Sequence, residues 1–131
     1  MDIDRRNYDG IPRTGSPHFQ AVRAGDLLFL AGATAKLTRA ETGTMGEQTR
    51  VILERMDHIM KSEGGSLSDI VKITSYVTDL SEEAKSETQE VRVEFFGEDL
   101  PASTRVKVAG LDGPALLIEI DAIAVIPRDS L

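Results

Sequence analysis

The sequence predicts an α+β domain in which two helices cover one face of a β-sheet. Three observations support this prediction. Short runs with a period of two mark strands, while two longer runs carry apolar residues at three- and four-residue spacing. Their order is strand, strand, helix, strand, helix, strand, strand, which favours an antiparallel or mixed sheet. At 131 residues, the chain is expected to form a single domain over residues 1–131.

The first third of the chain predicts a polar N-terminal segment followed by two strands. Residues 1–15 are polar and contain glycine and proline, so they are expected to form an extended or loosely ordered N-terminal lead. Residues 18–24 and 27–33 read as two strands around a Gly25-Asp26 turn. Residues 36–44 are predicted to form a loop.

Two helices are predicted, with a strand between them. Residues 45–62 form the first helix, which Gly64-Gly65 ends. A third strand is expected over 70–78. Ser81 is a suitable N-cap for the second helix, which ends near Gly97. The residues that recur at helical spacing in the first helix are Thr49, Ile52, Leu53, Met56, Ile59 and Met60.

The C-terminal region contains two further alternating runs. Ser103 and Arg105 share one face of the first run, and Glu119 and Asp121 share one face of the second. The intervening Asp112-Gly113-Pro114 favours a turn, so the runs are expected to be neighbouring strands. Their charges would then either build a site for a small polar metabolite or lie solvated on the outside of the sheet.

The sheet face that the helices leave open needs a cover. Leu30, Ile73 and Val77 are expected to supply apolar or mixed surface there. This predicts a surface for a partner chain.

Composition limits the classes of function. The formal net charge is −7 and no basic cluster with interleaved aromatics occurs, which argues against nucleic-acid binding. No apolar run approaches the roughly 20 residues of a membrane helix, and the N-terminus resembles no secretory signal. The absence of cysteine excludes disulfides and agrees with a cytoplasmic location. With two histidines and no ligand spacing, no metal site is expected.

Several motifs resemble those of one known family. Residues 100–125 carry Pro-Ala-x-x-x-Val-x-Val-x-x-Leu followed by Ile-Glu-Ile-Asp-Ala-Ile-Ala-Val. This pattern closely resembles the C-terminal signature of the YjgF/RidA family, also called L-PSP or reactive intermediate deaminases. The resemblance extends in collinear order over residues 15–126, through segments 16–32, 48–50, 64–72 and 95–97.

The resemblance implies a fold and an activity. The fold would be chorismate-mutase-like, a sheet with two helices on one face, closed into a homotrimer with sites in the clefts between subunits. The activity would be hydrolytic deamination of a small enamine or imine carboxylic acid, releasing ammonia without a metal or organic cofactor. An arginine after Pro-Ala would bind the substrate carboxylate, and a glutamate would position the attacking water.

This sequence has only some of the functional residues that the family pattern implies. Glu119 stands at the glutamate position and is the expected catalytic residue, and Gly32 also matches. Ser103 replaces the carboxylate-binding arginine, His18 replaces a tyrosine, and Ala31 replaces a serine. The expected substrate-binding residues are therefore Arg105, Ser103, His18, Ala31 and Gly32.

Two residues have alternative roles. Arg105 lies two strand positions after Ser103, about 6.5–7 Å away, and would replace the missing anchor in a relocated pocket. Alternatively, it would pair with Glu119 or Asp121 across the strands. His18 would act as a hydrogen-bond donor or acid/base, or it is simply a polar residue at a strand edge.

Three functions follow from these alternatives. The first is a deaminase with altered substrate specificity, which the retained Glu119 favours. The second is a non-catalytic ligand-binding or regulatory trimer of the same fold, which the loss of the arginine and serine favours. A ribonuclease, as the L-PSP name suggests, is the least supported by this acidic chain.

Overall fold

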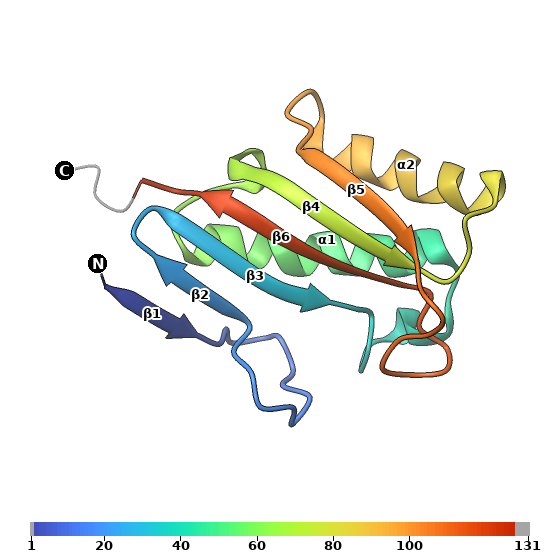
Figure 1. Cartoon of the computed structure of the whole chain (residues 1–131), viewed down its shortest axis with the longest axis horizontal. Helices are drawn as coiled ribbons and strands as arrows, with labels where there is room; N and C mark the ends of the chain where they lie inside the picture. The colour runs from blue at the N-terminus through green and yellow to red at the C-terminus, as the bar shows by residue number, and fades with distance from the viewer. Residues whose placement is uncertain (1, 128–131) are drawn as a thin grey trace.

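Two helices pack on one face of a six-stranded mixed sheet (Figure 1). The structure is a computed structural model that describes residues 2–127. The strand order is β1-β2-β3-β6-β4-β5. The elements are β1 (Ile3–Arg6), β2 (Ala21–Ala24), β3 (Leu27–Ala33), α1 (Met45–Ser62), β4 (Ile70–Val77), α2 (Glu82–Phe96), β5 (Ala102–Lys107) and β6 (Ile118–Val125). The predicted fold class is confirmed.

The helix α2 begins at its predicted N-cap, and α1 begins after Thr44, a cap at the end of the segment predicted as a loop. The Thr44 side chain accepts a hydrogen bond from the Glu47 backbone N–H, and the Glu47 carboxylate accepts one from the Thr44 N–H, which completes a capping box. Ser81 accepts from the Ala84 N–H at the start of α2. The predicted bounds of α1, residues 45–62, are confirmed. The apolar face of this helix packs on β3 and β6.

The N-terminal segment is more ordered than its composition suggests. Residues 3–6 form β1, which pairs antiparallel with β2. Arg6, Tyr8 and Arg23 all converge on Glu63 after the end of α1, with donor–oxygen distances of 3.1, 2.8 and 3.2 Å. The Glu63 side chain is only 1% exposed, so these partners compensate its buried charge. Of the two forms expected for the lead, extended or loosely ordered, residues 3–6 adopt the extended one.

The prediction that the last two strands are neighbours is wrong. β4 lies between them, pairing parallel with β5 and antiparallel with β6. The reason is the connection through α2, since a helical crossover returns the chain parallel to the strand that precedes it. The register pairs Ser75 with both Arg105 and Ile120, so Arg105 is on the helix-covered face. Glu119 is on the opposite, open face.

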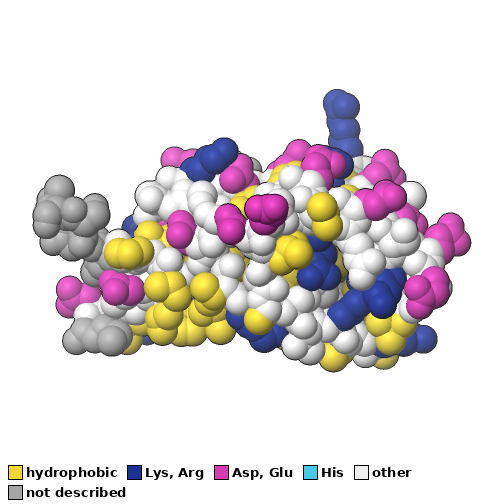
Figure 2. All heavy atoms as spheres, turned by 90° about the horizontal axis from the view of Figure 1, so that it is seen from above, with side chains coloured by type: hydrophobic (Ala, Val, Ile, Leu, Met, Phe, Trp, Pro, Cys, Tyr) yellow, Lys and Arg dark blue, Asp and Glu magenta, His cyan; other side chains and the backbone are white. Residues whose placement is uncertain are grey.

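The open face of the sheet is apolar, but its residues differ from those expected. Leu30, Ile73 and Val77 are expected on the open face, but they are buried on the helix side. Because successive side chains of a strand alternate between the two faces, the open face is formed by the neighbouring positions instead. The open face instead carries Leu27, Phe29, Val106 and Val125, which are between 38% and 42% exposed. In Figure 2, hydrophobic side chains gather at the lower left of the molecule. Within residues 2–127, no helix has the length and apolarity needed to cross a membrane.

Candidate functional site

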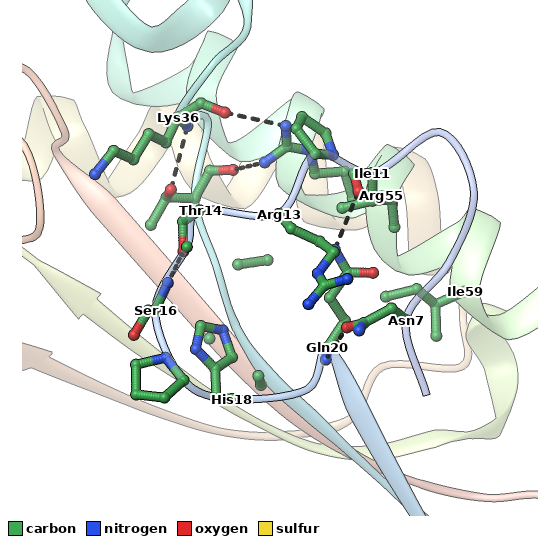
Figure 3. A pocket seen from close by; sticks show the side chains of 17 residues that line it. Asn7, Ile11, Arg13, Thr14, Ser16, His18, Gln20, Lys36, Arg55 and Ile59 are labelled. Atoms are coloured by element: carbon green, nitrogen blue, oxygen red, sulfur yellow. Dashed lines mark hydrogen bonds between the residues drawn. The ribbon is translucent and has the colours of Figure 1, made fainter. Parts of the chain in front are cut away.

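A pocket of about 250 Å³ lies between the N-terminal loop, the end of β3 and α1 (Figure 3). His18, Ala31 and Gly32 line it, three of the residues that the sequence predicts for substrate binding. His18 belongs to the loop before β2 and is exposed, because the strand expected from residue 18 begins only at Ala21. The pocket therefore brings His18 together with the consecutive residues Ala31 and Gly32.

Gln20 holds the loop that forms one wall of this pocket. Its Nε2 donates to the Ile11 carbonyl at 3.1 Å, and its Oε1 accepts from the Tyr8 N–H at 2.8 Å. Its own N–H donates to Asn7 Oδ1 at 3.1 Å. These bonds hold Asn7 and Ile11 beside Gln20 at one side of the pocket, where Figure 3 labels all three.

Arg55 holds the opposite wall. From α1 its two terminal nitrogens donate to the backbone carbonyls of Thr34 and Lys36 at 2.6 and 3.0 Å. Burial lowers the pKa of Arg55, whose charge these carbonyls partly stabilise. Sequence reasoning missed this residue, because an arginine on the polar side of a predicted helix carries no signal of its own.

Glu119 lies directly over Gly32, on the open face of the sheet. A Cβ atom built on Gly32 would collide with the Glu119 carboxylate oxygen, and would lie 2.8 Å from its Cδ and 3.0 Å from its Cγ. The pairing of β3 with β6 is irregular between Leu30 and Ala33, which places the bulge at this point. Gly32 is thus the residue that leaves room for the glutamate side chain.

The environment of Glu119 suits proton transfer. Burial raises the pKa of its carboxyl, and the negative charges of Asp121 and Asp112 raise it further, while His18 opposes them. Asp121, two residues along the strand, accepts a hydrogen bond from Tyr76 Oη at 3.0 Å. Glu119 takes part in no ion pair among residues 2–127. A half-buried carboxyl with a raised pKa is a candidate general acid/base.

We expect Gly32→Ala to lower turnover without unfolding the protein. The added methyl group displaces the Glu119 carboxylate, and a displacement of about 1 Å costs on the order of 10²-fold in rate. The measurement is kcat for the best substrate of the ammonia assay described below, together with circular dichroism. Gly110→Ala is the matched control, because nothing lies within 4 Å of a Cβ there. Equal kcat in the two variants would contradict the assigned role of Gly32.

Arg105 and Ser103 lie away from this group. The Arg105 side chain turns toward α2, where Nη1 donates to Thr88 Oγ1 at 2.7 Å and Nη2 contacts Met45 Sδ at 3.9 Å. The interpretation that Arg105 pairs with Glu119 or Asp121 is therefore wrong within one subunit. Ser103 is exposed and on the same face of β5 as Arg105. The predicted site residues thus form two groups on opposite faces of the sheet.

The chain is similar to known proteins over nearly its whole length. Residues 11–126 match the family described as Endoribonuclease L-PSP. A RutC family protein of Pyrococcus horikoshii is 39% identical over 88% of this chain and 92% of its own. The 3-aminoacrylate deaminase RutC of Acinetobacter baylyi is 30% identical over 88% of this chain and 92% of its own.

The fold is also that of a solved relative. The crystal structure of a member of the YjgF/YER057c/UK114 family from Mycobacterium tuberculosis superposes with a TM-score of 0.81 and 30% identity, covering 95% of this chain and 100% of that one. The motifs over residues 15–126 and the helix-covered mixed sheet agree with these matches. This chain therefore belongs to the endoribonuclease L-PSP family, which the RutC and YjgF/RidA proteins share.

Proposed function

We propose that this protein is a hydrolytic deaminase of small enamine or imine carboxylic acids. The observation that carries the proposal is the half-buried Glu119 carboxyl, with its raised pKa, lying over Gly32 beside His18. The similarity to a 3-aminoacrylate deaminase supports the substrate class, because aminoacrylate is an enamine carrying a carboxylate.

The chemistry requires only proton transfers and water. An enamine becomes an imine when one proton leaves its nitrogen and one is added at carbon, exchanged through water, and a water molecule then adds to the imine carbon. Glu119 accepts the proton of the attacking water and returns it to the nitrogen. The hydroxyl proton of the resulting carbinolamine then passes to the nitrogen as the C–N bond breaks, so that ammonia leaves and a carbonyl remains. Each step balances without a metal or redox partner.

The carboxylate of the substrate needs a cation. Arg13, Lys36 and Arg55 line the pocket, but Lys36 pairs with Asp112 and Arg55 donates to backbone carbonyls. Arg105 is our candidate, since a guanidinium fork binds a carboxylate through two hydrogen bonds. Because Arg105 is on the opposite sheet face, only a second copy of the chain can bring it to Glu119. The proposal therefore includes a homotrimer with sites between subunits, which the exposed apolar residues of the open face support.

The test is ammonia release from freshly generated substrates. The panel contains 2-aminoacrylate, 3-aminoacrylate, 2-iminobutyrate and 2-iminoglutarate, each followed by a coupled ammonia assay against its spontaneous rate. We expect at least one substrate to be hydrolysed faster than in buffer, and Glu119→Gln to remove that acceleration. No acceleration for any of these substrates would overturn the proposal.

One alternative has its own observations. Ser103 and Ala31 stand where the family carries arginine and serine, which favours a trimer that binds a small carboxylate without turning it over. Calorimetry with 2-oxobutyrate, the product of 2-iminobutyrate hydrolysis, distinguishes the two. Binding without ammonia release supports the non-catalytic alternative.

A further inference from the structure

Two arginines lie together between α2 and β5. Arg105 reaches across from β5 and donates to Thr88 Oγ1 at 2.7 Å. Arg92 is on α2 four residues after Thr88, one helical turn away on the same side. The positive charge of Arg105 lowers the pKa of Arg92, which shows that the two guanidinium groups are within electrostatic range.

The positive charge of this pair is compensated only at a distance, because neither arginine forms an ion pair among the residues that the structure describes. Asp79 is the one acid that raises the pKa of Arg105, but its carboxylate accepts hydrogen bonds from the Ser81 N–H and hydroxyl at 2.8 and 3.1 Å. For both arginines, burial is the largest cause that lowers the pKa.

The pair also leaves hydrogen-bonding capacity unused. The Nε atoms of Arg92 and Arg105 are both buried and have no hydrogen-bond partner. A buried donor without a partner costs about 1–3 kcal/mol. Elsewhere in the chain buried arginines are satisfied: Arg23, for example, donates to Glu63 and to the Ile126 carbonyl. The unsatisfied pair is therefore an exception within this protein.

We propose that Arg92 and Arg105 together bind a small dicarboxylic acid, so that the preferred substrate carries two carboxylates. Each guanidinium holds one carboxylate by charge-assisted hydrogen bonds, and Arg105 exchanges its Thr88 and Met45 partners for the carboxylate oxygens. Arg105 takes the carboxylate next to the reacting carbon, and Arg92 takes the distal one. This inference rests on the proposed function, because it places the reacting end of the acid at the Glu119 group of a second copy.

The surroundings favour a small anion over a large one. In Figure 2 the molecule is seen from above, from the side of α2 and β5, and acidic side chains lie along its upper border and right edge. α2 itself begins with Glu82 and Glu83. Such neighbours repel an extended polyanion such as RNA, whereas a dicarboxylate fits between two adjacent cations.

The test compares stable product-like acids by titration calorimetry. The probes are 2-oxoglutarate, with two carboxylates, and 2-oxobutyrate, with one. We expect the wild-type protein to bind 2-oxoglutarate about 10- to 100-fold more tightly, the range that a charge-assisted hydrogen-bond pair supplies. We expect Arg92→Gln to remove this preference while changing the affinity for 2-oxobutyrate by less than about threefold.

Arg39→Gln is the matched control, because Arg39 is exposed and forms no ion pair with any described residue. It should leave the preference unchanged. Equal binding of both acids by the wild-type protein, or equal weakening of both by Arg92→Gln, would overturn the inference. Inorganic phosphate is the third probe, and a phosphate affinity as high as that of 2-oxoglutarate and equally dependent on Arg92 would contradict a dicarboxylate site.

These results are independent of turnover. If 2-oxoglutarate binds with the expected dependence on Arg92 but no ammonia is released in the assay above, the arginine pair stands and the deaminase proposal falls. If ammonia is released from monocarboxylates alone and Arg92→Gln has no effect, the deaminase proposal stands and the arginine pair falls.

Discussion

Glu119→Gln is expected to reduce turnover by about 10²- to 10⁴-fold, the range of a general acid/base contribution, and to stabilise the folded protein at neutral pH. Glutamine keeps the size of the side chain over Gly32 but neither ionises nor exchanges a proton. The stabilisation follows because burial and the charges of Asp121 and Asp112 disfavour the ionised carboxylate in the folded state.

The pH dependence of this stabilisation has a definite sign. Because folding raises the pKa of Glu119, the folded state holds that proton more tightly than the unfolded state. Below the unfolded pKa of about 4.3 both states are protonated and the group has no effect. Above it, the native carboxylate costs stability increasingly until the pH exceeds the folded pKa. The Tm advantage of Glu119→Gln should therefore grow from pH 4 to pH 8.

Thermal melts at several pH values, with kcat at pH 8, measure both effects. Glu98→Gln is the control, because it makes the same chemical change at an exposed position in no ion pair. A Tm advantage that stays constant or shrinks with rising pH would show that Glu119 is not destabilised as a carboxylate. Turnover within a factor of two of wild type would remove it from the mechanism.

Local signals made the elements predictable. The caps at Thr44 and Ser81 depend on residues only a few positions apart, so they can be identified from sequence. Both are present in the structure. The strands over 27–33 and 70–77 show the expected alternation. Glu119 is identified from a motif within its own strand, and its catalytic role stays a prediction.

Long-range relations were not predictable in the same way. Alternation along β5 places Arg105 and Lys107 on one face of the sheet and Val106 on the other. It does not show which of the two faces the helices cover. That choice depends on β4, which enters between β5 and β6 although it precedes both in sequence. The electrostatic interaction of Arg92 with Arg105 on β5 likewise depends on how α2 packs against the sheet, and a single arginine on a helix gives no sign of it.

Because Glu119 and Arg105 lie on opposite faces of the sheet, a mixing experiment can test whether two copies of the chain share one site. We expect a mixture of Glu119→Gln and Arg105→Gln proteins to recover activity that neither has alone. In a site built by two copies, one copy supplies Glu119 and its neighbour supplies Arg105. After unfolding and refolding together at equal concentrations, about one quarter of the sites receive both intact residues. The expected rate is thus about one quarter of the wild-type rate per site.

The controls separate assembly from chemistry. Mixing without unfolding should recover less, since exchange then depends on dissociation of the preformed oligomers. Native mass spectrometry reports whether mixed oligomers have formed. If mixed oligomers are present and no activity returns, Glu119 and Arg105 do not act in one shared site. Recovery near one quarter would instead place the two sheet faces of neighbouring copies against each other, because no single chain joins these residues.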